Sequence, residues 1–348
     1  MRYLRSSPTR QGGAALVVAL LVFALCTALV VAMKLEFTRF YQRAGNIFVA
    51  EQAHAYLLGG EGLASLALLA DYDQEKGQEQ PRDDLNELWA QDSAPYPLDE
   101  GGWLVGRLED LQGRFNLNAL AQRVAEAEPA TGEGGEAQPR FTPAQAQFIR
   151  LLQALEEPPV SQQEAIQLTE AIADWLDADM EPTLNGAEDD FYYGMTPSFR
   201  AANRPMASAS ELRAVANMTP ELFRALRPWV TVWPQEPGTL NIHTAPAMVL
   251  RSINADDDLS PLSPDEGQAL AEQRDSAGFV DLEDFLASPV FAGKAEQMNR
   301  VKTLLGQSSS YFLLDAEVEV AGRNMHLYSV LERSGRKVSA VARANGSL

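Results

Sequence analysis

The densest group of chemically capable side chains in this chain is an acidic stretch at residues 174–190. Its oxygen-bearing side chains surround a glycine, and such loops suit calcium, which takes about 6–8 oxygen ligands in flexible geometry. No cysteine or histidine lies nearby, which argues against zinc or another softer metal. The spacing is not that of an EF-hand. We expect calcium ligands first from Asp177, Asp179, Glu188 and Asp189, and second from Asp190, Asp174 and Asn185.

An acidic loop that holds no metal is the alternative interpretation of this stretch. The whole chain has a formal net charge of −20, and solvated acidic loops are common in such proteins. Carboxylates this close together repel one another, however, and they are hard to order between aromatic residues without a cation. The residues alone therefore leave both interpretations open.

Other kinds of chemistry find little support in the sequence. The histidines His54, His243 and His326 are far apart and form no recognisable triad or metal-binding spacing. No Gly-x-Ser-x-Gly elbow, phosphate-binding loop or dinucleotide fingerprint is present. Because phosphate binding needs clustered basic residues, nucleic acid is a poor partner for so acidic a chain. The only cysteine, Cys26, excludes an intramolecular disulfide, and we expect a protein that is not an enzyme.

The first element that must position the rest of the chain is an uncharged apolar run at residues 14–33. As a helix it would extend roughly 30 Å, the thickness of the hydrocarbon core of a bilayer. Arg2, Arg5 and Arg10 precede the run and place the N-terminus in the cytoplasm by the positive-inside rule. The sequence therefore predicts a single-pass membrane protein whose later domains lie outside the cytoplasm.

The flanks of the apolar run are compatible with three kinds of signal. One is a permanent signal anchor, and another is a cleaved secretory signal that ends at Ala32. The third is a short basic leader ending at Gly13, which resembles the type III signal of type IV pilins and pseudopilins. This resemblance implies that a prepilin peptidase cuts between Gly13 and Ala14 and that Ala14 is N-methylated. Most members have a glutamate five residues after the cut, where this chain has Val18, and the missing charge suggests a subunit at a filament tip.

Further along, the hydrophobic pattern predicts a mixed α+β protein. Alternation predicts a strand at 103–110, and residues 111–118 suggest a turn and a second strand that enters a helix at Asn118. A long helical block follows, and three antiparallel strands come after it. Capping residues predict helix starts near Thr142, Ser161, Ser210, Thr219, Thr244 and Ser263. The segment 126–139, which has no apolar anchor, is expected to be disordered.

The order of these elements predicts one sheet against a long N-terminal helix, with the helical block inserted into the sheet as a second domain. The expected regions are a leader peptide at 1–13, a transmembrane and pilin helix at 14–70, the first part of the α/β domain at 71–120, an inserted α-domain at 121–306 and C-terminal strands at 307–348.

Several motifs, in order along the chain, resemble the K-type minor pseudopilin of type II secretion systems. They are Gly113-Arg-Phe-Asn-Leu-Asn, Asp174-Trp-Leu-Asp-Ala-Asp, Asn185-Gly-Ala-Glu-Asp-Asp, Asn203-Arg-Pro, Ser210-Glu-Leu and Leu240-Asn-Ile-His-Thr-Ala. The resemblance covers nearly the whole chain. It implies the pseudopilin fold, a long N-terminal helix packed on an antiparallel sheet, with a large inserted all-α domain that contains SAM-like or helix-hairpin-helix-like units. It also implies calcium in the acidic loop.

One stretch of the helical block, residues 274–286, resembles a helix-hairpin-helix, a unit that often binds DNA. Its acidic surroundings supply few contacts for phosphate, so we expect a packing module there.

The family resemblance also implies a place and a set of partners. The protein is expected in the bacterial inner membrane, with a cytoplasmic N-terminus and periplasmic domains, before it assembles at the tip of the pseudopilus. There it would initiate or cap assembly, for export of folded proteins across the outer membrane. The implied partners are the I-, J- and H-type pseudopilins, the prepilin peptidase and the inner-membrane assembly platform. A periplasmic calcium-binding or substrate-binding module on a permanent anchor is the alternative.

Overall fold

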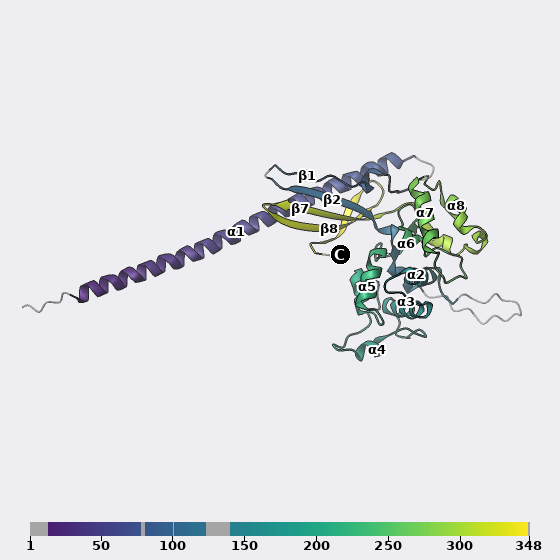
Figure 1. Ribbon diagram of the computed structural model, residues 1–348, viewed down its shortest axis with the longest axis horizontal. Coiled ribbons are helices and arrows are strands. Elements are labelled where there is room, and N and C mark those ends of the chain that lie inside the picture. The colour runs from purple at the N-terminus through teal and green to yellow at the C-terminus, as the bar shows by residue number, and fades with distance from the viewer. Residues whose placement is uncertain (1–12, 78–80, 100, 123–139, 277, 347–348) are drawn as a thin grey trace, which may run out of the picture.

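The molecule consists of one long helix and a folded body built around the C-terminal half of that helix (Figure 1). The computed structural model describes residues 13–77, 81–99, 101–122, 140–276 and 278–346. Most of the leader and the segment expected to be disordered lie outside these residues.

Helix α1 (Ala14–Glu75) is continuous over 62 residues. Its first half is exposed on all sides, and it is long and apolar enough to cross a membrane. The second half buries one stripe of side chains, Ala53, Leu57, Glu61, Ala64, Leu68, Asp71 and Glu75. Steps of three and four residues place these side chains on one helical face. The helix runs past residue 70 because Asp71 and Glu75 still face the folded body.

The face of α1 packs on a five-stranded antiparallel sheet with the order β1-β2-β7-β8-β9. Its strands are β1 (Tyr96–Pro97), β2 (Trp103–Asp110), β7 (Tyr311–Val320), β8 (Arg323–Arg333) and β9 (Val338–Ala344). Along β7, alternate residues such as Phe312 and Leu314 point into the core, as the period of a strand requires. The expected long helix and antiparallel sheet are thus confirmed.

The turn and short strand expected at 111–118 are present, but this strand does not belong to the main sheet, because the chain leaves that sheet immediately after β2. The Asp110 side chain accepts a hydrogen bond from the Gln112 backbone N–H at 2.8 Å and starts the 3₁₀ turn η2 (Leu111–Gly113). Only β3 (Phe115–Asn116) is extended in the following residues, and it pairs in parallel with β4 (Val230–Thr231), outside the main sheet.

The residues between β2 and β7 form the second part of the body, which we call the α-domain. Its helices are α2 (Pro143–Ala154), α3 (Gln162–Leu176), α4 (Asp189–Tyr193), α5 (Pro220–Leu226), α6 (Ala247–Leu250), α7 (Pro264–Ser276) and α8 (Leu282–Leu286). Its 3₁₀ turns after η2 are η3 (Leu117–Ala121), η4 (Ala209–Ala214), η5 (Arg227–Trp229), η6 (Pro289–Phe291), η7 (Ala295–Gln297) and η8 (Val301–Leu304). A second parallel pair joins β5 (Leu240–Asn241) to β6 (Leu305–Gly306). One further turn, η1 (Leu88–Ala90), lies between α1 and β1.

Most helix starts in the α-domain follow the capping residues of the sequence. Thr142 and Ser161 each form a capping box, with Gln145 and Glu164. The start expected near Ser210 lies two residues earlier, where the Ser208 hydroxyl caps η4.

Three hydrophobic cores hold the body together. One unites α1 with the sheet, around Leu57, Leu68 and Phe312. The α-domain has two cores, one around α2 and α3 and the other around α6, α7 and α8. The acidic loop belongs to the first of these two, next to α3.

Candidate metal centre

The acidic loop is held between two helices by an aromatic cluster. Helix α3 ends at Leu176, and Asp177 is its C-terminal cap. The chain returns through Glu188 into the short helix α4. The rings of Trp175 and Tyr192 meet edge to face at 5.1 Å between centroids, and Tyr192 lies 5.2 Å from Phe199. These contacts fix the two ends of the loop beside each other.

Three of the four first-choice ligands come together in this loop. Asp177, Asp179 and Glu188 each place a carboxylate oxygen within 4.8 Å of the other two. Asp177 and Glu188 lie at opposite ends of the loop, so it is the fold and not local sequence that joins them. A cluster of this kind carries a negative charge that a divalent cation would neutralise.

Glu188 is the most strongly perturbed member of the cluster. Its side chain is buried, at 4% exposure, and neither carboxylate oxygen has a hydrogen-bond partner among the described residues. Burial is the main cause that raises its pKa to about 7, and the charges of Asp174, Asp177 and Asp179 contribute to the same shift. A buried acceptor without a donor is costly, and a cation is the partner that would satisfy it.

Two further oxygens in the same region were missed by reasoning from the sequence. The buried Asn203 Oδ1 and Thr183 Oγ1 have no hydrogen-bond partner in the described part of the chain. Asn203 has a positive φ of 44°, and its Nδ2 donates to the Asp179 carbonyl at 2.7 Å. In the sequence, only the residue type could have pointed to Asn203, because asparagine is one of the few residues that tolerate a positive φ.

The remaining predicted ligands are engaged in holding the loop. Asp189 Oδ1 accepts from the Ala201 backbone N–H at 3.0 Å. Asn185 donates its backbone N–H and its Nδ2 to Glu170 Oε2, at 2.9 and 2.7 Å. Asp190 is exposed to solvent.

Asp174 is buried and supports the loop from the last turn of α3. Its Oδ2 accepts from the Thr183 backbone N–H at 3.0 Å. A Cβ on Gly186 would lie 1.8 Å from this same oxygen, so the loop can close here only because residue 186 is glycine. The donor set is hard oxygen throughout, which fits calcium, and calcium at this site remains a prediction.

A second group of carboxylates, Asp71, Asp83 and Glu87, also has oxygens within 4.8 Å of one another. It differs from the first group because the Arg333 guanidinium pairs with two of its members, Asp71 and Asp83. It is therefore an ion-pair cluster.

The fold and the site together define a class. An apolar membrane-length helix continues into the core of an antiparallel sheet, and a helical domain with an acidic loop interrupts that sheet. This is a pilin-like protein with an inserted domain, and its N-terminal helix is consistent with a single-pass membrane anchor.

Comparisons with known proteins identify the family within this class. The family "Type II secretion system (T2SS), protein K" matches residues 113–235 and 240–304, which correspond to the two cores of the α-domain. Type II secretion system protein K of Pectobacterium carotovorum is 31% identical over 97% of both chains. The protein of the same name from Pseudomonas aeruginosa is 33% identical over 97% of this chain and 93% of its own.

A solved structure agrees with these relatives. A chain in the crystal structure of the GspK-GspI-GspJ complex of the enterotoxigenic Escherichia coli Type 2 Secretion System superposes with a TM-score of 0.72 at 28% identity. The match covers 88% of this chain and 100% of that one. The chain belongs to the type II secretion system protein K family, and is thus a minor pseudopilin of the secretion apparatus.

Proposed function

We propose that this minor pseudopilin sits at the tip of the pseudopilus and initiates or caps its assembly. The position of the α-domain is the main support for this proposal. The domain lies at the end of the body that is remote from the membrane half of α1 (Figure 1). A subunit placed above this one in a filament would collide with it.

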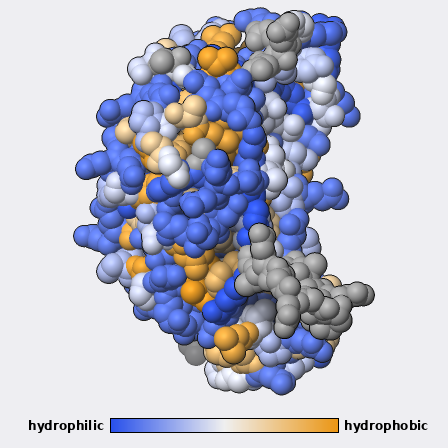
Figure 2. All heavy atoms as spheres, turned by 90° about the vertical axis from the view of Figure 1, so that its right-hand side faces the viewer, coloured by the Kyte–Doolittle hydropathy of each residue, from blue (hydrophilic) through white to orange (hydrophobic). Residues whose placement is uncertain are grey.

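The surface at that end fits such a position. Seen along the long axis from the α-domain side, the molecule is mostly hydrophilic, with hydrophobic residues in separate small areas (Figure 2). The α1 face, in contrast, exposes large apolar side chains such as Phe23, Phe40 and Leu66. Buried contacts with other subunits are therefore favoured along the helix and not at the far end.

The start of the chain supports the same pathway. Cleavage between Gly13 and Ala14 would leave α1 intact, because the helix begins at Ala14. Val18 has no charge to neutralise in the membrane or at the end of a filament, where no neighbour lies above it. The protein would be held in the inner membrane with its body in the periplasm, be processed by the prepilin peptidase, and enter the filament through the assembly platform.

The I- and J-type pseudopilins are the proposed partners, with the H type below them. Support comes from the E. coli structure, which is described as a complex of GspK with GspI and GspJ. The role proposed for the present chain is then structural, not catalytic. We also propose that calcium binds Asp177, Asp179 and Glu188 and orders the acidic loop, and that α6, α7 and α8 form a packing unit like a helix-hairpin-helix.

Purification of the full chain in detergent together with I- and J-type partners tests the partner assignment. We expect a ternary complex, and failure to bind either partner would favour the permanently anchored module. Counting subunits in isolated filaments tests the tip position. We expect this chain at far lower copy number than the main pseudopilin and only at filament ends, whereas labelling along the whole shaft would contradict the tip.

A further inference from the structure

The two chain segments that connect the sheet to the α-domain are tied together by buried acidic residues. The chain leaves the sheet at Asp110, at the end of β2, and returns at Ser309, just before β7. The Asp110 carboxylate accepts from the Ser309 hydroxyl at 2.6 Å, and from the Thr244 hydroxyl of the α-domain at 2.6 Å. We call the two connecting segments at Asp110 and Ser309, together with the residues bonded to them, the neck.

A second carboxylate, Asp83, ties the loop after α1 to the same neck. It accepts from the Ser309 backbone N–H, and its own backbone N–H donates to the Gln307 carbonyl at 3.0 Å. Asn241 of the α-domain donates to the Asp83 carbonyl at 2.9 Å and to Asp110 at 3.1 Å. Asp83 is fully buried, so these bonds are shielded from water.

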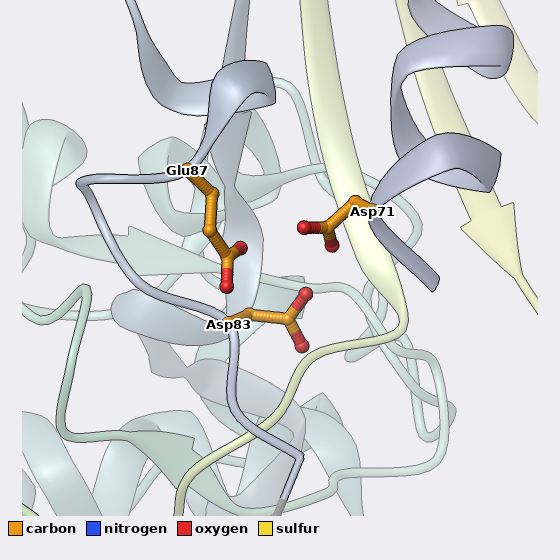
Figure 3. Close-up of side chains that lie close together, drawn as sticks. All are labelled: Asp71, Asp83 and Glu87. Atoms are coloured by element: carbon orange, nitrogen blue, oxygen red, sulfur yellow. The ribbon is translucent and has the colours of Figure 1, made fainter. Parts of the chain in front are cut away.

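The network ends in the ion-pair cluster of Asp71, Asp83 and Glu87. Figure 3 shows Asp71 at the end of α1 and the other two on the following loop, with the three carboxylates close together. Arg333 of β8 donates to Asp71 at 2.7 Å and also pairs with Asp83. The Arg333 guanidinium pairs with Asp71 and Asp83 but not with Glu87. The Glu87 Oε2 instead accepts a hydrogen bond from the Trp89 indole N–H at 2.5 Å.

The neck has more negative groups than positive ones to balance them. The carboxyl groups that face it are Asp71 and Glu75 of α1, Asp83, Asp84 and Glu87 of the loop, and Asp110 of β2. The cations are Arg82 of the loop and Arg333 of β8, with Arg274 beyond them on the α-domain. Burial lowers the pKa of the neighbouring His243 and so favours its neutral form. Burial of such an excess is costly unless some carboxyl groups stay neutral.

We propose that the neck holds a proton, and that the α-domain keeps a fixed angle to the sheet only while this proton is present. Glu87 is the acid that carries it. When its carboxyl group is neutral, Glu87 adds no negative charge beside the oxygens of Asp71 and Asp83, which lie within 4.8 Å of its own. Ionised Glu87 would instead repel the carboxylate of Asp83, the residue whose backbone ties the loop to Gln307 and Asn241.

The pKa values agree with this assignment. Burial raises the pKa of Glu87 to about 9, with the nearby charges of Asp71, Asp83 and Glu75 acting in the same direction. Burial also raises the pKa of Asp83 to about 7, although Arg333 opposes the shift. A folded-state pKa above the unfolded value means that stability is greatest at low pH and is lost as pH rises through the folded value. The neck should therefore loosen on the alkaline side.

Distances between spin labels test the proposal in the full chain. With Cys26→Ala, cysteines introduced at the exposed positions Gln162 of α3 and Val341 of β9 report the angle between α-domain and sheet. We expect one narrow distance distribution at about pH 6.5 and a broad one at about pH 10, above the pKa of Glu87. The matched variant Glu87→Gln stays neutral and keeps an acceptor for Trp89, so its distribution should remain narrow at both pH values.

A variant that removes an exposed carboxylate, Glu221→Gln, should behave like the unsubstituted protein. Equal broadening in Glu87→Gln, or none in the unsubstituted protein, would overturn the proposal. Hydrogen exchange in the unsubstituted chain gives a test that needs no variant. Relative to the core of α3, the amides of Gln112 and Ser309 should lose protection selectively above about pH 9, and unchanged relative protection would also overturn it. Neither test depends on where the protein sits in a filament.

Discussion

At the scale of single residues, the proposed calcium site depends most on Glu188. Among the residues that the structure describes, no donor reaches its buried carboxylate, which lies beside Asp177 and Asp179. If a calcium ion supplies the missing partner, the ion binds the folded state alone and must stabilise it; a concentration about 100 times the Kd adds roughly 2.7 kcal/mol.

We therefore expect calcium to raise the melting temperature of the unsubstituted protein but not that of Glu188→Gln. Asp190→Asn is the matched control, because it removes one charge from an exposed carboxylate of the same loop. Its melting temperature should rise with calcium as in the unsubstituted protein. The measurement is a thermal melt with calcium and with chelator, and identical curves in both would leave the loop as an ordinary acidic loop.

The sequence indicated this loop but not its internal arrangement. The sequence shows its carboxylates as one group. Which of them come together in the cluster, and which hydrogen-bond to the loop backbone instead, depends on the fold. Asp189 looks equivalent to Glu188 in the sequence, yet its oxygen is taken by the Ala201 N–H. Asn203 lies outside the acidic stretch, and only the backbone around α3 brings it to Asp179.

At the scale of elements, the second half of α1 has two faces with different tasks. Leu57 is fully buried against the sheet, while Leu66 is 62% exposed. Leu57→Ala should lower the free energy of unfolding by about 2–5 kcal/mol, because it leaves a cavity in the core. Leu66→Ala should leave that free energy nearly unchanged and weaken the complex with the partner pseudopilins.

Chemical denaturation and co-purification measure these two effects separately. A Leu66→Ala variant that unfolds as easily as Leu57→Ala would show that this face is part of the folded core and not a contact surface.

Elements with strong local signals were the easiest to predict. The capping boxes at Thr142 and Ser161 and the alternation in β7 and β8 are local, and the structure has them. The second strand, expected within 111–118, shows the limit of such signals, because they did not indicate that it pairs outside the main sheet. Its residues alternate suitably, but the Asp110 side chain turns the backbone, and the extended remainder pairs with β4, far away in the sequence.

At the scale of the whole molecule, the arrangement is set by contacts between residues that are distant in sequence. Arg333 pairs with Asp71 and Asp83, and Asp110 bonds to Thr244 and Ser309. No local sequence pattern indicates such pairs, so the neck could not be predicted. The strands and helices on either side of it could be predicted, because their signals are local. These contacts hold the α-domain beyond the sheet, where it would prevent another subunit from stacking.

We propose that α1 is first a membrane anchor and then part of a filament core. This requires removal of the leader and retention of the entire helix. Mass spectrometry of the N-terminus of the mature protein, purified from cells that contain a prepilin peptidase, tests this most directly. We predict a chain that begins at Ala14 with a methylated amine. An intact Met1, or a start after Ala32 that removes the apolar half of α1, would contradict the account.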